Sequence, residues 1–202
     1  MGVLRYGLVI LASYLLGSFP TGYLAARLWR GVDPTQHGSG RTGGTNVLRA
    51  AGKGPALLTV VGDLAKGTLA VLLARVCIGT EPAMAVAGLA AVLGHNHSVF
   101  LGFRGGAGAM TNVGVVLVLA PYVVPVVAVA AFVAAVRTHT ASLTSIASVV
   151  ATVVAFVASF LFWHIPVVYV VYSVLACAMI LFDLRANIAR LRAGSERRVD
   201  SY

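Results

Sequence analysis

Two glycine-rich segments, residues 38–46 and 102–108, carry most of the side chains in this sequence that could do chemistry. They read GSGRTGGTN and GFRGGAG, so glycines are mixed with hydroxyl groups, an amide and arginines. Glycine lets the backbone approach a ligand closely, and backbone amides together with guanidinium groups bind anions. We therefore predict a site for a phosphate-bearing substrate.

The first segment is followed by a basic residue at helical spacing. Thr45 or Asn46 is predicted to cap a helix that places Arg49 about one turn further on. The loop amides, the Ser39 hydroxyl and the guanidinium group could then converge on one phosphate. The alternative is a flexible, solvated connector, although a connector does not require glycines and amides at this density.

The second segment follows two histidines. Gly105 and Gly106 permit the backbone to approach a ligand. His95 and His97 invite a metal interpretation, but their spacing does not place both on one helical face, and no nearby carboxylate or cysteine completes a ligand set. We expect no metal, and we interpret His95 as a hydrogen-bonded residue at a helix end.

Two further polar pairs stand three residues apart. Asp63 and Lys66 fall inside an apolar helix, where ionisable groups are rare and usually paired or functional. We predict a structural pair that locks the helices together or positions Arg49. Asn187 and Arg190 open the C-terminal tail and could close the site, or could simply anchor the helix end.

The sequence contains no serine–histidine–acid arrangement, paired carboxylates or Walker-type lysine. No catalytic residue is therefore assigned. The chemistry must depend on positioning the reactants and stabilising anions.

The amino-acid composition indicates which kind of secondary-structure element positions these residues. Of the 202 residues, 59% are hydrophobic and 10% charged. Mean hydropathy is +0.91. The net charge of +9 could suggest nucleic acid, but the arginines cluster beside apolar runs, as in membrane anchoring. We predict one all-α, multi-pass integral membrane domain over residues 1–202 and no nucleic-acid partner.

Six apolar spans are predicted, at residues 3–28, 55–78, 84–100, 113–136, 143–163 and 167–182. Residues 27–53 carry five basic side chains against one acidic one, and 5 − 1 gives +4, so this connection should be cytoplasmic and the N-terminus outside. Residues 194–202 are expected to form a short frayed tail.

The fourth span cannot cross once without placing Arg137 and the arginine-rich tail outside. Pro121 and Pro125 predict a break. The piece before it, residues 112–120, is about 13 Å long, too short for a core of roughly 30 Å. A bent pair of pieces returning to the cytoplasm gives about seven transmembrane or half-membrane helices, with both glycine loops and the C-terminus on the cytoplasmic face.

Four motifs in order resemble one family, the bacterial acyl-phosphate-dependent glycerol-3-phosphate acyltransferases of the PlsY type. The family pattern S-G-N-x-G-A-T-N-x-x-R corresponds to SGRTGGTNVLR at residues 39–49, and D-L-x-K-G to DLAKG at 63–67. The pattern G-H-x-x-P-x-F-L-x-F-x-G-G-K-G corresponds to GHNHSVFLGFRGGAG at 94–108, and H-R-x-N-I-x-R-L to LRANIARL at 184–191.

The resemblance implies a seven-helix enzyme of the bacterial plasma membrane with a cytoplasmic site. Such enzymes transfer an acyl chain from acyl phosphate to the 1-hydroxyl of glycerol 3-phosphate, giving lysophosphatidic acid for phospholipid biosynthesis. We expect no cofactor and membrane lipid as the surroundings, and a monomer is one possibility, since the sequence does not reveal the oligomeric state. The substrate-binding set predicted from motifs and resemblance together is Ser39, Arg41, Gly43, Thr45, Asn46, Arg49, Arg104, Gly105, Gly106 and Asn187, with Asp63, Lys66, His95 and Arg190 supporting it.

Four departures from the family pattern change the chemistry of a side chain. Arg41 replaces an asparagine, Ser98 a proline, Ala107 a lysine and Leu184 a histidine. The last two motivate an alternative function, a catalytically degenerate relative that binds lipid phosphates or regulates a true acyltransferase. A transporter is disfavoured, because no repeat or matching pair of broken helices is present.

Overall fold

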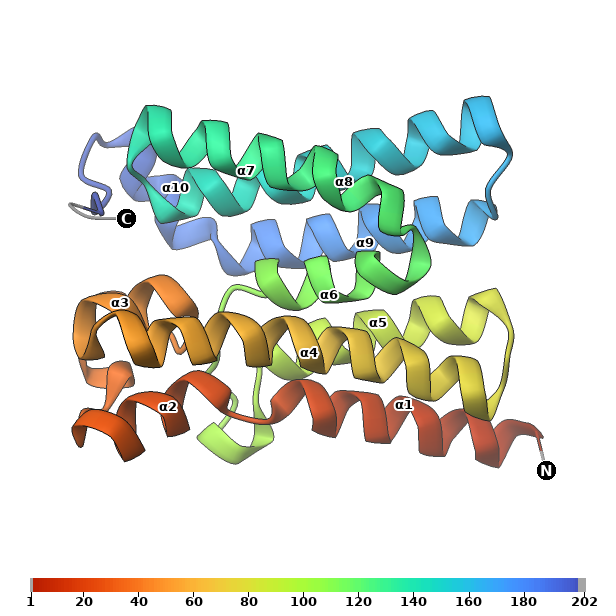
Figure 1. Cartoon of the computed structure of the whole chain (residues 1–202), viewed down its shortest axis with the longest axis horizontal. Helices are drawn as coiled ribbons and strands as arrows, with labels where there is room; N and C mark the ends of the chain where they lie inside the picture. The colour runs from red at the N-terminus through yellow and green to blue at the C-terminus, as the bar shows by residue number, and fades with distance from the viewer. Residues whose placement is uncertain (1, 200–202) are drawn as a thin grey trace.

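The computed structural model describes residues 2–199. Within that range the backbone forms ten α-helices, three short 3-10 helices and no β-strand (Figure 1). The α-helices are α1 (Gly2–Ser18), α2 (Thr21–Arg30), α3 (Gly44–Ala51), α4 (Lys53–Cys77), α5 (Glu81–Asn96), α6 (Ala109–Leu119), α7 (Val124–Thr138), α8 (Ala141–Trp163), α9 (Val167–Asp183) and α10 (Arg185–Arg192). The 3-10 helices are η1 (Pro34–Gln36), η2 (Val99–Leu101) and η3 (Pro121–Val123).

The long helices lie side by side along the long axis of the molecule (Figure 1). In one group α1 packs against both α4 and α5, and in the other α7 packs against α8 and α8 against α9. The short helix α6 packs on α4 and lies between the groups, and α5 also contacts α9. The buried core consists of several apolar clusters between these helices rather than one central core.

The outer surface is apolar, as expected for a protein in lipid. Large side chains such as Phe132, Val154 and Phe162 are exposed along α7 and α8. Four segments are long and apolar enough to cross a bilayer, and the bent pair α9–α10 raises the number to five among residues 2–199. The protein is therefore an integral membrane protein with an all-helical fold, as its composition predicts.

The first apolar span is broken rather than continuous. The sequence predicts one helix over residues 3–28, but α1 ends at Ser18 and α2 begins at Thr21. Pro20 lies at the break, where its missing N–H removes one helical hydrogen bond. Similarly, the span predicted at 84–100 ends at Asn96, because the following residues turn into the second glycine loop.

The bent pair predicted from two prolines is present. Helix α6 ends at Leu119, η3 makes the turn, and α7 runs back toward the end of the molecule from which α6 came (Figure 1). Arg137, near the end of α7, therefore lies toward the same end of the molecule as α3 and the C-terminus.

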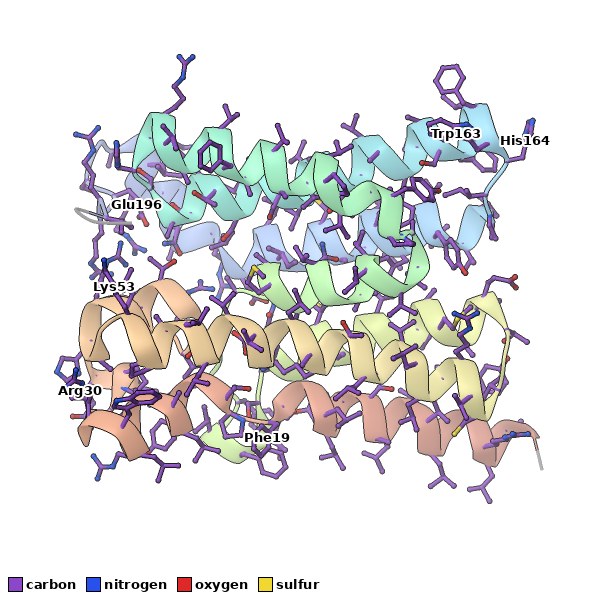
Figure 2. All side chains as sticks on the ribbon, in the orientation of Figure 1. Phe19, Arg30, Lys53, Trp163, His164 and Glu196 are labelled. Carbon is purple, nitrogen blue, oxygen red and sulfur yellow. The ribbon has the colours of Figure 1, made fainter. Side chains whose placement is uncertain are left out.

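The two ends of the molecule differ in composition. Figure 2 shows Arg30, Lys53 and Glu196 at the end that also holds α3 and α10, and Trp163 and His164 at the opposite end. The first glycine loop lies at the polar end, whereas the α5–α6 connection with the second loop lies about midway along the long axis (Figure 1).

Candidate functional site

A cavity of about 350 Å³ lies where the first glycine loop faces α6, α7, α8 and α10. Its lining is polar near the first loop, α10 and the tail, and apolar along α6 and α7. The polar part includes Ser39, Arg41, Thr45, Asn46, Arg49, Asn187, Glu196 and Arg197, and the apolar part includes Val113, Val124, Val127, Ala128 and Ala131. The cavity thus suits an amphiphile with an anionic head.

Asn46 organises the first loop. The two N–H groups of its Nδ2 are shared among the carbonyl oxygens of Pro34 (2.8 Å), His37 (3.0 Å) and Arg41 (2.7 Å), and its Oδ1 accepts from the Ser39 amide at 2.9 Å. The side chain is buried. Both of its polar atoms therefore serve the shape of the loop, although the residue also borders the cavity.

Helix α3 begins two or three residues earlier than the predicted caps at Thr45 or Asn46 would place it. Gly43, in an extended conformation, is the N-cap, and Thr45 and Asn46 lie inside the first turn of the helix. The amides of Gly44 and Thr45 have no acceptor within the helix, and both residues border the cavity. Arg49 follows on the same short helix and also lines the cavity, as the helical spacing predicts.

Arg41 joins three elements. Its guanidinium group donates to the carbonyl oxygens of Gly106 (3.4 Å) and Asp183, and to Asn187 Oδ1 at 3.5 Å. Burial lowers the pKa of Arg41, and the charge of Asp183 opposes that shift. Arg41 thus lines the cavity while it ties the first loop to the second and to the α9–α10 junction.

A buried charged cluster lies beside the cavity. Asp63 Oδ1 is 3.0 Å from Lys66 Nζ and 3.5 Å from His95 Nδ1. Lys66 also donates to the Phe19 carbonyl, at the break between α1 and α2, at 3.2 Å. The predicted structural pair is therefore present, but its further contacts are with His95 and Phe19 rather than with Arg49.

The second loop has its glycines for a different reason than the sequence suggests. A Cβ on Gly105 would lie 2.0 Å from the His95 carbonyl oxygen, and one on Gly106 would lie 2.0 Å from His95 Nε2. In the described chain the cavity wall here is Ala107 and Gly108, not these two glycines. The glycines let the loop pass against the end of α5.

Arg104 is not brought to the cavity. Its side chain is exposed, its backbone pairs with Ser98, and it is absent from the cavity lining within residues 2–199. Thr42, by contrast, links the two loops directly, because its amide donates to the Gly105 carbonyl at 3.2 Å.

Two departures from the family pattern are close neighbours. Ala107 and Leu184 pack in one apolar cluster and both line the cavity. The guanidinium group of Arg41 donates hydrogen bonds to the carbonyl oxygens of Gly106 and Asp183, which directly precede Ala107 and Leu184 in the sequence. A cation from the first loop therefore lies beside the position where the pattern has a lysine in the second loop.

Three residues of the site were missed from the sequence. Asp183 accepts from Asn96 Nδ2 and pairs with His97 Nε2 at 3.2 Å, Glu196 binds residues of α8 and α10, and Arg197 lines the cavity. The chain has only six acidic residues. That scarcity is a signal that could have pointed to Asp183, because an acid retained at the end of an apolar helix usually has a partner.

Residues 2–199 contain no group of three or more histidine, cysteine, aspartate or glutamate side chains that could hold a metal ion. The cavity offers arginines, amides and hydroxyl groups. Such a donor set binds and orients phosphoryl oxygens.

Comparison with known proteins places this geometry in a family. The family model described as glycerol-3-phosphate acyltransferase matches residues 7–194. A glycerol-3-phosphate acyltransferase of Synechococcus sp. (strain JA-3-3Ab) is 41% identical over 195 residues, which cover 95% of this chain and 92% of that protein. Another, of Alkaliphilus metalliredigens (strain QYMF), is 38% identical over 192 residues and covers 95% of each chain.

The fold also matches a solved structure. The crystal structure of PlsY (YgiH), an integral membrane glycerol 3-phosphate acyltransferase in its glycerol 3-phosphate form, superposes with a TM-score of 0.87 at 35% identity, covering 96% of this chain and 94% of that one. The lysophosphatidic acid form of the same protein gives a TM-score of 0.83 at 34% identity.

Proposed function

The chain belongs to the glycerol-3-phosphate acyltransferase family, and from that premise we propose that it transfers an acyl chain from acyl phosphate to the 1-hydroxyl of glycerol 3-phosphate. The products are lysophosphatidic acid and inorganic phosphate. The observation that carries this proposal is the amphiphilic cavity, with arginines at one part and apolar side chains at the other.

The charge of the cavity fits two phosphate-bearing reactants. Arg41, Arg49 and Arg197 line it, and none of the three belongs to the four ion pairs formed within residues 2–199. The two lining carboxylates, Asp63 and Glu196, are each held by basic partners. The three arginines are therefore not neutralised by ion pairs within the described chain and can bind the phosphates of the substrates.

The apolar part of the cavity supports an acyl substrate. Val113 on α6 and Val124, Val127 and Ala131 on α7 line it, with no charged side chain among them. Burial of a hydrocarbon chain along such a wall contributes about 0.8 kcal/mol per CH₂ group. We assign the acyl chain to this wall and the phosphate to the loop.

The reaction needs no protein nucleophile. The glycerol 3-phosphate hydroxyl oxygen attacks the acyl carbonyl carbon, the bond from that carbon to the phosphate oxygen breaks, and phosphate leaves with the electron pair. A phosphate oxygen accepts the hydroxyl proton. Arg49, the α3 amides of Gly44 and Thr45, and Arg41 stabilise the charge on the phosphates, so catalysis depends on positioning and electrostatics.

The presence of Ala107 and Leu184 in place of lysine and histidine does not abolish the proposed anion-binding site. They replace polar side chains of the family pattern by an apolar contact, while Arg41 supplies a guanidinium group next to them. The remaining cations support an active enzyme over the non-catalytic alternative. Restoring Ala107→Lys together with Leu184→His should therefore change activity by less than tenfold, whereas a large gain from near zero would favour the alternative.

We further propose that the polar end faces the cytoplasm and that one chain forms the complete site. Basic residues such as Arg30 and Lys53 gather at that end (Figure 2), in line with the positive-inside tendency. All the lining residues of the cavity come from one chain, so the proposed site needs no residue of a second one. Labelling of single cysteines with a membrane-impermeant reagent tests the orientation, and light scattering of the detergent-solubilised protein tests the mass.

The activity is tested with the purified full chain in detergent. Acyl phosphate and glycerol 3-phosphate should give lysophosphatidate and inorganic phosphate in equal amounts, and boiled protein or omission of either substrate should give none. Acyl thioesters serve as comparison donors, and activity with them but not with acyl phosphate would refute the donor assignment. No product from folded protein would refute the proposed function.

A further inference from the structure

The C-terminal tail is an ordered strap rather than the frayed end that the sequence predicts. Residues 194–199 pass from α10 to the α7–α8 connection, where the Val199 amide donates to the His139 carbonyl at 2.7 Å and the Val199 side chain is buried. Arg49 of α3 donates to the Arg198 carbonyl at 3.3 Å. We call residues 194–199 the strap. The prediction for residues 200–202 lies outside the described residues.

Glu196 holds the strap in place. One carboxylate oxygen accepts from Asn187 Nδ2 at 2.7 Å and from Ser142 Oγ at 3.3 Å, and the other accepts from Arg190 Nε at 2.8 Å. Its side chain is only 8% exposed. A buried carboxylate is costly unless it is paired and hydrogen-bonded, so these three donors from α8 and α10 fix the position of the strap.

Of the two neighbouring arginines of the strap, Arg197 reaches the cavity and Arg198 does not. Arg197 is part of the cavity lining and is exposed, so it lies at the mouth, while its neighbour Arg198 is outside the lining. Within residues 2–199 the Arg197 side chain makes no hydrogen bond or ion pair. Arg41, in contrast, has donors committed to Gly106, Asp183 and Asn187.

We propose that Arg197 is a phosphate-binding residue of the acyl-transfer site and that Glu196 is the positioning residue that holds it at the cavity mouth. This inference rests on the proposed function. A phosphate dianion is bound best by charge-assisted hydrogen bonds from several sides. Arg49 approaches from α3, Arg41 from the first loop, and Arg197 closes the remaining side from the strap.

The test compares neighbouring arginines in the full-length enzyme. Arg197→Gln should raise the KM for at least one phosphate-bearing substrate tenfold or more, with a smaller change in kcat, and Arg197→Lys should recover part of the loss. Arg198→Gln, which keeps the backbone carbonyl that accepts from Arg49, should stay within twofold of the wild type. Equal effects of Arg197→Gln and Arg198→Gln would overturn the assignment.

Glu196 is tested through its coupling to Arg197. Glu196→Ala should raise the same KM, and the double variant Glu196→Ala/Arg197→Gln should be no worse than Arg197→Gln alone, because Glu196 acts through Arg197. Independent, multiplying effects, or a gain of activity on removing Glu196, would contradict the proposal. If Glu196→Ala unfolds, Glu196→Gln keeps the shape and the acceptor oxygen and should give a smaller increase in KM.

A second experiment distinguishes failure of the phosphate-site proposal from failure of the proposed function. If the wild type shows no acyl transfer, the strap is tested by the shift in apparent unfolding temperature that glycerol 3-phosphate produces. A shift present in the wild type and in Arg198→Gln but lost in Arg197→Gln supports the phosphate site. The same shift in all three proteins, or none in any, overturns it.

Discussion

The two glycine-rich loops have similar compositions but use their glycines differently. In the first loop the shape is set by hydrogen bonds from one buried amide, Asn46, and the loop exposes Ser39, Gly43 and Thr45 to the cavity. In the second loop Gly105 and Gly106 lie against His95 with no room for a side chain. Glycine content alone therefore does not distinguish a ligand-binding loop from a loop that must pack closely.

The largest expected difference between the loops concerns folding. Gly105→Ala places a Cβ 2.0 Å from the His95 carbonyl oxygen, a backbone atom that cannot move aside easily. We expect a loss of stability of about 3 kcal/mol or more, seen as a large drop in apparent unfolding temperature in detergent.

Gly43→Ala is the matched control in the first loop. It has no atom within 4 Å of the added Cβ, and its φ of −76° suits any residue. It should fold with a cost below about 1 kcal/mol, since alanine is a poorer N-cap. Equal destabilisation by the two substitutions would remove the distinction between the loops.

The next difference concerns activity. Arg49→Ala removes a lining cation, and the loss of charge-assisted hydrogen bonds of about 1.5–3 kcal/mol corresponds to roughly 10- to 150-fold in kcat/KM. Arg104→Ala, in the second loop, should stay within about twofold, roughly 0.4 kcal/mol, because Arg104 does not reach the cavity. Both are read in the acyl-transfer assay, and a large loss for Arg104→Ala would show that the second loop binds substrate directly.

A smaller effect is expected from a substitution that loosens the conformation of the first loop. Asn46→Ala leaves the carbonyls of Pro34, His37 and Arg41 without their shared donor. We expect a cost of about 1–2 kcal/mol and faster trypsin cleavage after Arg41 in the folded protein.

Asn46→Asp should be no better than Asn46→Ala, since a carboxylate would face three carbonyl oxygens. Protection from trypsin equal to the wild type in both variants would indicate that the loop is held by other contacts.

The smallest expected effect is a pH dependence of stability at Asp33, which caps η1 just before the first loop. Hydrogen bonds from Thr35 lower the pKa of Asp33 below its ordinary value of 3.8. This stabilisation is fully present above pH 3.8 and is lost as the pH falls through the lower folded-state pKa. Asp33→Ala should cost about 0.5 kcal/mol at neutral pH and progressively less as the pH falls below 3.8. Apparent unfolding temperatures measured over a pH series test this, and a difference from the wild type that does not change with pH would exclude the carboxylate charge as its cause.

The sequence predicted the parts of the fold that depend on local pattern. Apolar runs located the long helices, and Pro121, Pro125 and the placement of Arg137 were enough to predict the return of α7. The break at Pro20 was missed, because hydropathy continues across it, although Pro20 is the same kind of helix-breaking signal as Pro121 and Pro125.

The parts that were not predicted depend on contacts between distant residues. The motifs correctly brought Ser39, Arg41, Arg49 and Asn187 to one cavity. They could not show that Arg41 would bond to Asp183, 142 residues away, or that Arg49 would bond to the strap, 149 residues away. Such contacts follow from the packing of α9 and α10, which no local pattern encodes.

The contact between Lys66 and the Phe19 carbonyl has a consequence for how this protein can evolve. At the break the Phe19 carbonyl oxygen accepts from the Thr21 amide at 2.9 Å and from Lys66 Nζ at 3.2 Å. In an unbroken helix this oxygen would accept from the amide of Tyr23 and would lie along the helix axis, so Lys66 would depend more on Asp63, its other partner. Pro20, Lys66 and Asp63 should therefore vary together among relatives, and a lineage that straightens its first helix should also have exchanged the buried charges.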